Sequence, residues 1–279
     1  MLQGVNEILP DELSKRHDVI EKMVGCFKSN KYNRVTTPTF EPYAELSKGW
    51  GPYLKEKSIK FISHDGAIMV LRPEMTTPIA RLVSARNQEL IFPQKFFYLE
   101  NVFRKQHILR KQEFLQIGAE LLGDDSINAD IRIVNLLIDV LHSAGIEDFK
   151  IELGHIEHSE TETLEIKEAL MNKEYNKLDK LPALGDVSIL TKGSYLKEFD
   201  DLFRQIAPEN MDHLVYNLGL APEVTYYTGI IFNVLLEGVG YVVGSGGRYD
   251  TLYKEYSFDI PAIGFALGFE KLITYFKGK

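Results

Sequence analysis

Hydrophobic side chains recur every three to four positions in several stretches of the chain, a period that predicts amphipathic helices. The clearest case lies near the start, where Leu13, Ile20 and Val24 share one helical face and Pro10 suits the first turn. The stretches with helical signals cover residues 11–30, 76–87, 127–144 and 265–276. We therefore expect these segments to form the main helices of the fold.

Other stretches alternate between hydrophobic and polar residues, with turn residues between them, and these are predicted to be strands. The predicted strands cover residues 34–37, 61–63, 67–71, 95–104, 112–123, 149–153 and 213–218, followed by a long hairpin across 226–244. The glycine-rich run Gly244–Arg248 is predicted to be a tight turn. Because hairpins are separated by helical blocks, we expect an α+β fold in which helices flank an antiparallel β-sheet.

Residues 158–210 differ from their surroundings in composition. They are rich in Glu, Lys, Asp and Leu and contain few β-branched residues, so several short helices on one side of the main body are predicted. No Pro- or Ser-rich linker separates this segment from the rest of the chain. We therefore expect residues 1–279 to form a single domain with 158–210 as a helical insertion.

Composition narrows the range of functions. The net charge is -8, which disfavours non-specific nucleic-acid binding as the main role. The single cysteine, Cys26, allows neither an internal disulfide nor a cysteine metal cage, as is typical of the reducing cytoplasm. The start lacks a signal-peptide pattern, and Asn233 and Glu237 interrupt the most apolar stretch, 229–244. We therefore expect a cytoplasmic protein without a membrane span.

Arg104 lies at the end of a predicted strand and is followed by a basic loop, residues 105–111, that includes Arg110. The returning strand carries Gln116 and Glu120 on one face, because alternate residues of a strand point the same way. An arginine in this position is suited to bind a carboxylate or phosphate through two parallel hydrogen bonds. The structural alternative is a solvated basic turn with an Arg–Glu pair at its base.

A second polar corner follows the predicted strand 67–71. Glu74 has a carboxylate that suits a ligand ammonium group, and Thr76 offers a hydroxyl beside it. Glu74 is equally suited to stabilise the amino end of the predicted helix that begins at Thr76, since a negative charge is favourable there. Both interpretations stay open on these residues alone.

Two runs contain glycines that allow close approach of the backbone to a small ligand, or mark tight turns without one. They are Tyr226–Gly229 (Tyr-Tyr-Thr-Gly) and Gly244–Asp250. Neither is a phosphate-binding loop of the Gly-x-x-x-x-Gly-Lys type. His155 and His158 are close in sequence, but no further cluster completes a metal site. We therefore expect no metal and no cofactor.

The segment Gly264–Leu272 has a glycine at each end of its first turn, Gly264 and Gly268. These glycines are expected to let the start of a helix pack tightly against a strand. Packing is the better explanation of the segment taken alone, since it requires no ligand.

The order and spacing of these segments resemble the catalytic core of class II aminoacyl-tRNA synthetases, and within them the histidyl type. Thr37–Glu41 is similar to the first, dimer-forming motif of that family, Phe103–Glu120 to the second and Gly264–Leu272 to the third, and the likeness runs from about residue 4 to residue 275. The resemblance implies a histidine-like pocket and a neighbouring anion or phosphate site. The pocket would contain Glu74, Thr76, Gln116, Glu120, Tyr226, Tyr227, Gly246 and Arg248, and the anion site Arg104, Arg110 and Lys271.

At several positions the chain departs from the synthetase pattern, and these departures predict that it has no catalytic residues. The arginine that precedes Tyr-Tyr-Thr-Gly in histidyl enzymes corresponds to Pro222, which has neither a side-chain donor nor a backbone N–H. Losing one preorganised donor to developing charge costs roughly 10²–10³ in rate. The Glu-Arg pair that ends the third motif is Glu270-Lys271 here, and lysine lacks the planar fork of arginine. The loop of the second motif is also shorter, and no anticodon-binding domain is expected after Lys279.

These departures are similar to those of the histidyl-synthetase-like regulatory subunits of ATP phosphoribosyltransferase. The resemblance implies a non-catalytic protein that activates the short-form catalytic subunit in the first step of histidine biosynthesis and makes it sensitive to histidine. It also implies a homodimer within a hetero-octamer, with histidine as effector and without tRNA. Apolar residues around Phe40 and Tyr43 fit such a dimer.

The main alternative is an enzyme that still forms histidine adenylate and charges tRNA or another carrier. Arg104 and Glu120 favour this alternative, whereas Pro222 and Lys271 oppose it. A plain tRNA-binding role needs a basic surface, which the acidic composition does not suggest. The location of the effector also stays open, since the pocket and the junction with the catalytic subunit both fit the sequence.

Overall fold

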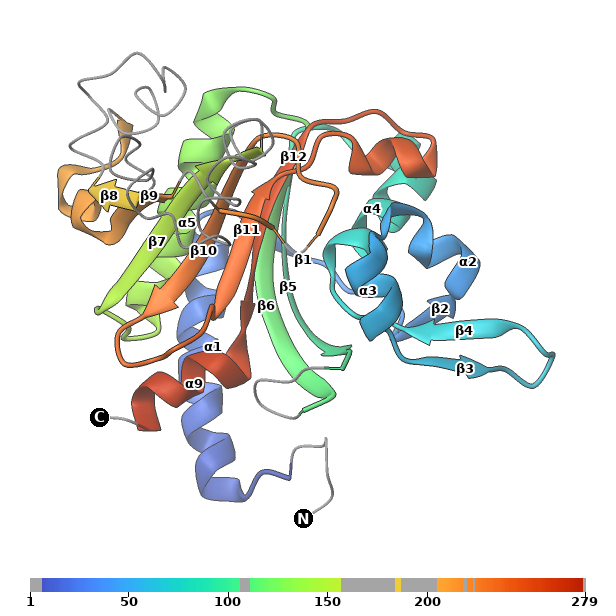
Figure 1. Ribbon diagram of the computed structural model, residues 1–279, viewed down its shortest axis with the longest axis horizontal. Coiled ribbons are helices and arrows are strands. Elements are labelled where there is room, and N and C mark those ends of the chain that lie inside the picture. Colours follow the sequence, from blue (N-terminus) through green and yellow to red (C-terminus); the bar gives the residue numbers. More distant parts are fainter. Residues whose placement is uncertain are drawn as a thin grey trace, which may run out of the picture.

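The computed structural model describes residues 7–105, 111–156, 184–186, 205–217, 220–222 and 224–277. Nine strands within these residues form one large sheet (Figure 1). In sheet order they are β1 (Asn33–Arg34), β5 (Gln94–Phe103), β6 (Glu113–Leu122), β12 (Ala262–Gly268), β11 (Gly244–Arg248), β10 (Ile230–Leu236), β7 (Phe149–His155), β9 (Leu214–Asn217) and β8 (Leu184–Asp186). The pairings are antiparallel except for β1 with β5 and β7 with β9. The α+β prediction is confirmed, and the sheet is mixed only towards its two ends.

The helices predicted over residues 11–30, 76–87 and 127–144 are confirmed, with small shifts of their ends. The α-helices in the described residues are α1 (Pro10–Ser29), α2 (Tyr43–Leu46), α3 (Pro52–Lys57), α4 (Thr76–Ala85), α5 (Ile127–Ser143) and α9 (Phe269–Lys277). Short 3-10 helices are η1 (Ser47–Gly49), η2 (Asn87–Glu89), η5 (Pro208–His213) and η6 (Leu252–Tyr256). In the part of the chain that is described, no helix is both long and apolar enough to cross a bilayer.

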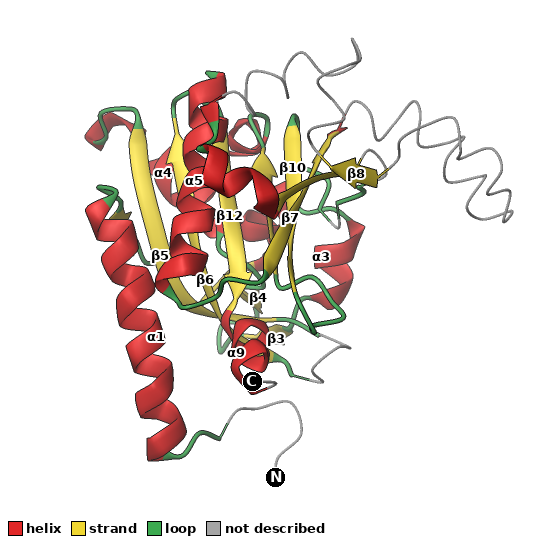
Figure 2. Ribbon diagram, turned by 90° about the vertical axis from the view of Figure 1, so that its left-hand side faces the viewer, coloured by secondary structure: helices red, strands yellow, loops and turns green. Residues whose placement is uncertain are grey.

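Helices cover both faces of the large sheet, and two neighbouring residues of β5 illustrate the division. Phe97 belongs to the core that includes α1 and α5, whereas Tyr98 packs with α4 and η6 in a separate core. Successive side chains of a strand point to opposite faces, so the two cores lie on opposite sides of the sheet. Figure 2 shows α1 and α5 together across one of these faces.

A second sheet of three strands lies beside the large one. Its strands are β2 (Phe40–Pro42), β4 (Ile68–Leu71) and β3 (Lys60–Ile62), and β3 with β4 forms the predicted hairpin. This hairpin projects away from the large sheet at the right of Figure 1. Its small core contains Leu46, Trp50, Leu54 and Val70, while Phe40, Phe61, Ile62 and Ile68 remain exposed.

Two predictions for the glycine-rich C-terminal part are wrong. Gly244–Arg248 is not a turn but strand β11, which pairs with β10 and β12 inside the sheet. A Cβ atom at Gly246 would clash with the Phe232 ring and the Gly264 carbonyl, so this glycine serves close packing between strands. The last helix begins only at Phe269, because the preceding residues form β12.

The predicted helical insertion, residues 158–210, lies mostly outside the described residues. Within it, residues 184–186 form strand β8, which pairs with β9 at the end of the large sheet. The expectation of helices alone is therefore wrong for these three residues.

Candidate ligand-binding cavity

A cavity of about 390 Å³ lies beside the central strands of the large sheet. Strands β6, β10, β11 and β12 contribute to its walls, together with the start of α4 and residues 220–222. The predicted site residues that line it are Glu74, Thr76, Arg104, Gln116, Tyr226, Tyr227, Gly246 and Lys271. The fold therefore gathers most of the predicted site around one space, although these residues are widely separated in sequence.

Glu74 both caps a helix and lines the cavity. Its carboxylate accepts the backbone N–H of Thr76 at 2.6 Å and that of Thr77 at 3.1 Å, at the amino end of α4. Burial raises the pKa of Glu74, whereas these hydrogen bonds and the charge of Arg104 lower it. The capping interpretation of the sequence is confirmed, and the same carboxylate still faces the cavity, so the two roles do not exclude each other.

Glu120 lies behind the cavity wall instead of lining it. Its Oε1 accepts the Thr76 hydroxyl at 2.9 Å, and its Oε2 accepts the Tyr249 hydroxyl. The side chain is almost completely buried, and burial raises the pKa of Glu120 to about 8 despite these two donors. Gly264 has no side chain because a Cβ there would clash with the Glu120 carboxylate. A ligand therefore meets Thr76 and Tyr249 before it meets Glu120.

Tyr249 is a cavity residue that the sequence interpretation missed. It follows strand β11 directly and points its hydroxyl towards Glu120. The signal that could have revealed this strand is the two-residue alternation of hydrophobic and polar side chains. A run of glycines, which have no side chains, does not show it.

Tyrosine side chains lie close to the buried carboxylates of Glu74 and Glu120. Burial raises the pKa of Tyr98, Tyr226, Tyr227 and Tyr249, and the nearby carboxylates raise it further. The rings of Tyr226 and Tyr249 are 5.8 Å apart between centroids, and those of Tyr226 and Tyr227 are 5.2 Å apart. These hydroxyls therefore stay protonated at neutral pH and remain hydrogen-bond donors.

Two cavity residues retain hydrogen-bonding capacity. Gln116 is 6% exposed, and its Oε1 is buried without a hydrogen-bond partner among the described residues. Arg104 donates from Nη1 to the Pro73 carbonyl at 2.5 Å and lies 4.7 Å from the centroid of the Phe114 ring. Its Nε is buried and has no hydrogen-bond partner in the same part of the chain. An unused buried acceptor on Gln116 and an unused buried donor on Arg104 point to a ligand that supplies a donor for the first and an acceptor for the second.

Charge is distributed unevenly around the cavity. Lys271 donates to the Val242 carbonyl at 2.8 Å and, with Arg104, provides the cationic side chains among the lining residues. Pro222, at the position where the resemblance places the arginine of histidyl enzymes, lines the cavity together with Leu220 and Ala221. That wall is apolar and offers no side-chain donor. Arg110, the third predicted anion contact, lies outside the described residues.

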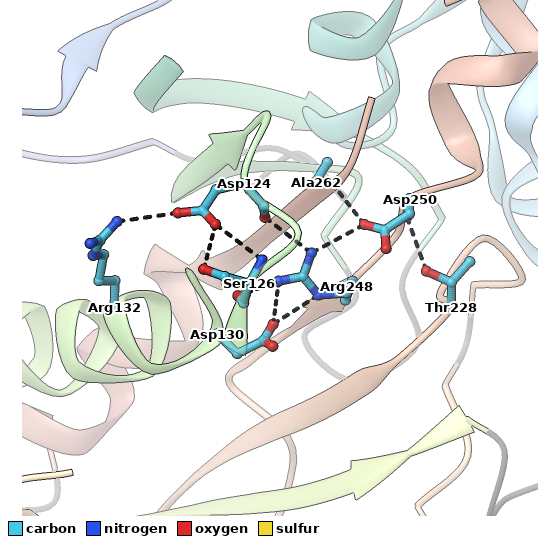
Figure 3. A network of polar contacts seen from close by, with 8 residues as sticks. All are labelled: Asp124, Ser126, Asp130, Arg132, Thr228, Arg248, Asp250 and Ala262. Carbon is cyan, nitrogen blue, oxygen red and sulfur yellow. Dashed lines mark hydrogen bonds and ion pairs between the residues drawn. The ribbon is translucent and has the colours of Figure 1, made fainter. Parts of the chain in front are cut away.

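Arg248 does not line the cavity, which contradicts its predicted place among the pocket residues. Its guanidinium points away into a buried network with Asp124, Asp130 and Asp250 (Figure 3). Burial raises the pKa of Asp130 to about 6, against the opposing charge of Arg248. The arginine is neutralised within the protein and has no capacity left for an anionic ligand.

No group of three or more His, Cys, Asp or Glu side chains in the described residues is arranged to hold a metal ion. His158, the second histidine considered above, lies outside the described residues, while His155 is at the end of β7.

Comparison with known proteins identifies the family to which the chain belongs. A family model described as histidyl-tRNA synthetase matches residues 4–183 and 156–272. The ATP phosphoribosyltransferase regulatory subunit of Halothermothrix orenii is 31% identical over 309 residues, covering 96% of this chain and 74% of that protein. The corresponding subunit of Desulfitobacterium hafniense is 32% identical over 314 residues, covering 97% of this chain and 80% of that protein. The chain belongs to the family of ATP phosphoribosyltransferase regulatory subunits.

A solved structure of the same type supports the fold. The protein from Bacillus halodurans C, described as an ATP phosphoribosyltransferase regulatory subunit/histidyl-tRNA synthetase, superposes with a TM-score of 0.86 at 25% identity. The superposition covers 99% of this chain and 82% of that one. The resemblance to a histidyl-synthetase-like class II core is confirmed. The family is named for regulatory subunits, in agreement with the prediction of a non-catalytic chain.

Proposed function

We propose that this chain binds the short-form catalytic subunit of ATP phosphoribosyltransferase, activates it and makes it sensitive to histidine. The observation that carries this proposal is a polar cavity with an apolar wall at Pro222, where the resembling histidyl enzymes have an arginine. Such a cavity still recognises an amino acid, but at the Pro222 position it lacks the arginine donor for the charge that develops when a carboxylate attacks ATP. The family membership supports the regulatory role.

Histidine suits the groups that the cavity offers. Glu74 provides a carboxylate for the ammonium group, and Arg104 provides a guanidinium for the carboxylate. The unpartnered Gln116 oxygen is an acceptor for an N–H group, and Thr76 and Tyr249 present hydroxyls backed by Glu120. Histidine then regulates the partner by binding two conformations of the complex unequally, and couplings of this kind are typically about 1–3 kcal/mol.

Calorimetric titration tests this site. We expect histidine to bind the isolated chain, and binding to be lost in Glu74→Gln, because the carboxylate charge that faces the ammonium group is removed. The matched control is Glu89→Gln, since the Glu89 side chain is 67% exposed and pairs only loosely with Arg86 at 3.8 Å. Binding that occurs only in the presence of the catalytic subunit would move the effector to the junction between the subunits.

Partner binding has its own test. The chain should co-purify with a short-form catalytic subunit that lacks a regulatory domain of its own, and it should raise that subunit's rate of joining ATP to phosphoribosyl pyrophosphate. Histidine should then lower the rate of the complex more than that of the catalytic subunit alone. A catalytic subunit that is equally active and equally sensitive without this chain would contradict the proposal.

The alternative is an enzyme that forms histidine adenylate and charges tRNA or another carrier. It is favoured by Arg104 and Glu120, both at or next to the cavity, and opposed by Pro222 and Lys271. Exchange of pyrophosphate into ATP in the presence of histidine distinguishes the two functions. We expect no exchange above background, and robust exchange would establish the alternative. Filter binding at physiological salt tests whether the chain has a plain tRNA-binding role. We expect no binding of tRNA.

A homodimer within a hetero-octamer completes the proposal. The small sheet exposes Phe40, Phe61, Ile62 and Ile68, and the rings of Phe40 and Phe61 meet edge to face at 5.5 Å between centroids. A contiguous apolar patch of this kind is typical of a protein contact. Sedimentation should give a dimer that Ile62→Asp weakens, because a charge is then buried in the contact. A monomer at micromolar concentration would contradict this part of the proposal.

A further inference from the structure

A network of polar contacts around Arg248 extends to Thr228 (Figure 3), which directly follows the cavity residues Tyr226 and Tyr227. The network joins the loop after β6, the start of α5 and the end of β11. We name it the Arg248 brace, and it consists of Asp124, Ser126, Asp130, Arg248 and Asp250. These residues are not used by the ligand contacts proposed above.

Every guanidinium nitrogen of Arg248 has an acceptor within the brace. Nε donates to Asp130 Oδ1 at 3.0 Å, and Nη2 lies 2.8 Å from the same oxygen and donates to the Ser126 carbonyl at 3.3 Å. Nη1 donates to the Asp124 carbonyl at 3.2 Å and to Asp250 Oδ1 at 3.3 Å. Arg248 is only 7% exposed, so water competes little for these contacts.

Asp250 connects the brace to the cavity wall. Its Oδ1 accepts Arg248 Nη1 and the Ala262 N–H, the latter at 2.9 Å, while its own N–H donates to Thr228 Oγ1 at 3.0 Å. The Thr228 N–H in turn donates to the Arg248 carbonyl at 2.8 Å. Thr228 follows Tyr227 directly, so two hydrogen bonds fix the chain immediately after the cavity tyrosines.

Packing supports the same connection. A Cβ atom placed at Gly229 would lie 3.3 Å from Cβ and Cδ of Arg248, and one placed at Gly247 would lie 2.9 Å from the Tyr227 ring. The aliphatic part of Arg248 therefore covers Gly229, and the ring of Tyr227 covers Gly247. The cavity wall and the end of β11 therefore pack closely at both glycines, and at Gly247 a Cβ atom would clash with its neighbours.

We propose that Arg248 is a positioning residue for the cavity: it holds Asp250 and the segment 226–229 in place, and thereby fixes Tyr226 and Tyr227 where they line the cavity. Arg248 acts through these residues and does not touch the ligand. That the ligand is histidine rests on the proposed function, whereas the positioning role rests on the contacts of Arg248 alone.

The planar guanidinium is essential to this role. In Arg248→Lys the positive charge opposite Asp130 is kept, but a single ammonium group does not reach Asp130, Asp250 and two carbonyls at once. The matched control is Arg132→Lys. Arg132 also contacts the network, at 3.2 Å from Asp124 Oδ2, but its side chain is 54% exposed and it lies on the side away from Asp250 (Figure 3).

Hydrogen exchange followed by mass spectrometry, combined with histidine titration of the full chain, tests the proposal. In Arg248→Lys we expect faster exchange in the peptide that covers residues 226–230, unchanged exchange in α1, and a Kd for histidine raised roughly tenfold, within the range typical of coupled sites. Arg132→Lys should leave both measurements unchanged. Faster exchange throughout the molecule, or unchanged exchange in 226–230 of a folded Arg248→Lys variant, would overturn the positioning role.

Thr228→Val provides a second, milder variant in case Arg248→Lys does not fold. It removes only the hydroxyl that accepts the Asp250 N–H, so the same peptide should exchange faster and the Kd should rise by a smaller factor. Unchanged exchange in this variant would also overturn the proposal. If the wild-type chain does not bind histidine, the proposed histidine site in the cavity fails, while the exchange comparison still decides whether Arg248 holds the cavity wall.

Discussion

Two arginines near the cavity have opposite surroundings. Every guanidinium nitrogen of Arg248 has an acceptor in the protein, and the residue lies behind the wall. Arg104 lines the cavity, has one hydrogen bond from Nη1 to the Pro73 carbonyl, and keeps a buried Nε without a hydrogen-bond partner among the described residues. A fully paired group holds structure, whereas an incompletely paired one retains capacity for a ligand.

Two buried carboxylates extend this comparison. Asp130 is paired with the Arg248 guanidinium, and its pKa is raised by burial to about 6. Glu120 has only hydroxyl partners, from Thr76 and Tyr249, and its pKa is raised by burial to about 8. Asp130 is therefore largely ionised at neutral pH, and Glu120 is largely protonated. The Arg248 brace is held by an ion pair, whereas Glu120, behind the cavity wall, is held by hydrogen bonds between neutral groups.

The largest expected effect comes from removing the partner of the buried guanidinium. In Asp130→Ala, Arg248 keeps its charge in a buried site without its main counter-charge, and breaking a buried pair from one side costs about 3–5 kcal/mol. Urea unfolding followed by circular dichroism measures this loss. The matched control is Asp259→Ala, because Asp259 and Lys254 form a largely exposed pair at 3.4 Å, expected to contribute about 0–1 kcal/mol. Equal losses of unfolding free energy in the two variants would show that the buried ion pair of the Arg248 brace stabilises the fold no more than an exposed pair.

The pH dependence of stability separates the two carboxylates. The folded-state pKa of Glu120, about 8, lies above the ordinary value of 4.5, so the folded chain keeps a proton that the unfolded chain releases. The resulting stabilisation is fully present below the unfolded pKa and is lost as the pH rises through the folded pKa. Between these values, the wild-type chain should lose up to about 1.4 kcal/mol per pH unit more than Glu120→Gln.

Asp130→Asn serves as the comparison in the same experiment. Because its folded pKa is raised only to about 6, the corresponding loss from Asp130 should be complete near that pH, whereas the loss from Glu120 continues to about 8. Urea unfolding across this range gives the slopes directly. Identical slopes for the wild-type chain and Glu120→Gln above the pKa of Asp130 would show that Glu120 is ionised in the fold.

The sequence predicted the parts of the fold that depend on local periodicity. The helices α1, α4 and α5 and the hairpin of β5 with β6 follow from hydrophobic patterns within a few turns or one strand pair. Strand β11 could not be found in this way, because Gly-Ser-Gly-Gly carries no β-branched or aromatic residue. Its glycines leave room for Phe232, Tyr227 and other neighbours, which come close only in the folded sheet.

The candidate site shows the same limit. Some residues of the predicted segments, such as Glu74 and Gln116, line the cavity. The resemblance to histidyl enzymes placed Arg248 in the pocket, and the sequence carries no signal that this arginine pairs with Asp130, 118 positions away. Glu120 was assigned as a direct contact, since the hydroxyls of Thr76 and Tyr249 that cover it depend on tertiary structure.

The smallest expected change in stability belongs to Gln116, and it tests the ligand side of the comparison. Gln116→Leu removes a buried oxygen that has no hydrogen-bond partner in the described residues, and such a replacement should alter the free energy of unfolding by less than about 1 kcal/mol. If the oxygen instead serves a ligand N–H, the Kd for histidine should rise about tenfold, since one hydrogen bond contributes roughly 0.5–1.5 kcal/mol.

Asn135→Leu is the matched control for this variant. Asn135 also has a buried oxygen without a hydrogen-bond partner in the described part of the chain, but it lies in α5 and does not line the cavity. Calorimetry should therefore give an unchanged Kd for Asn135→Leu and a weakened one for Gln116→Leu, at similar stabilities. Equal affinities in the two variants would mean that an unpaired oxygen in the cavity has no more significance for binding than one in a helix packed against the sheet.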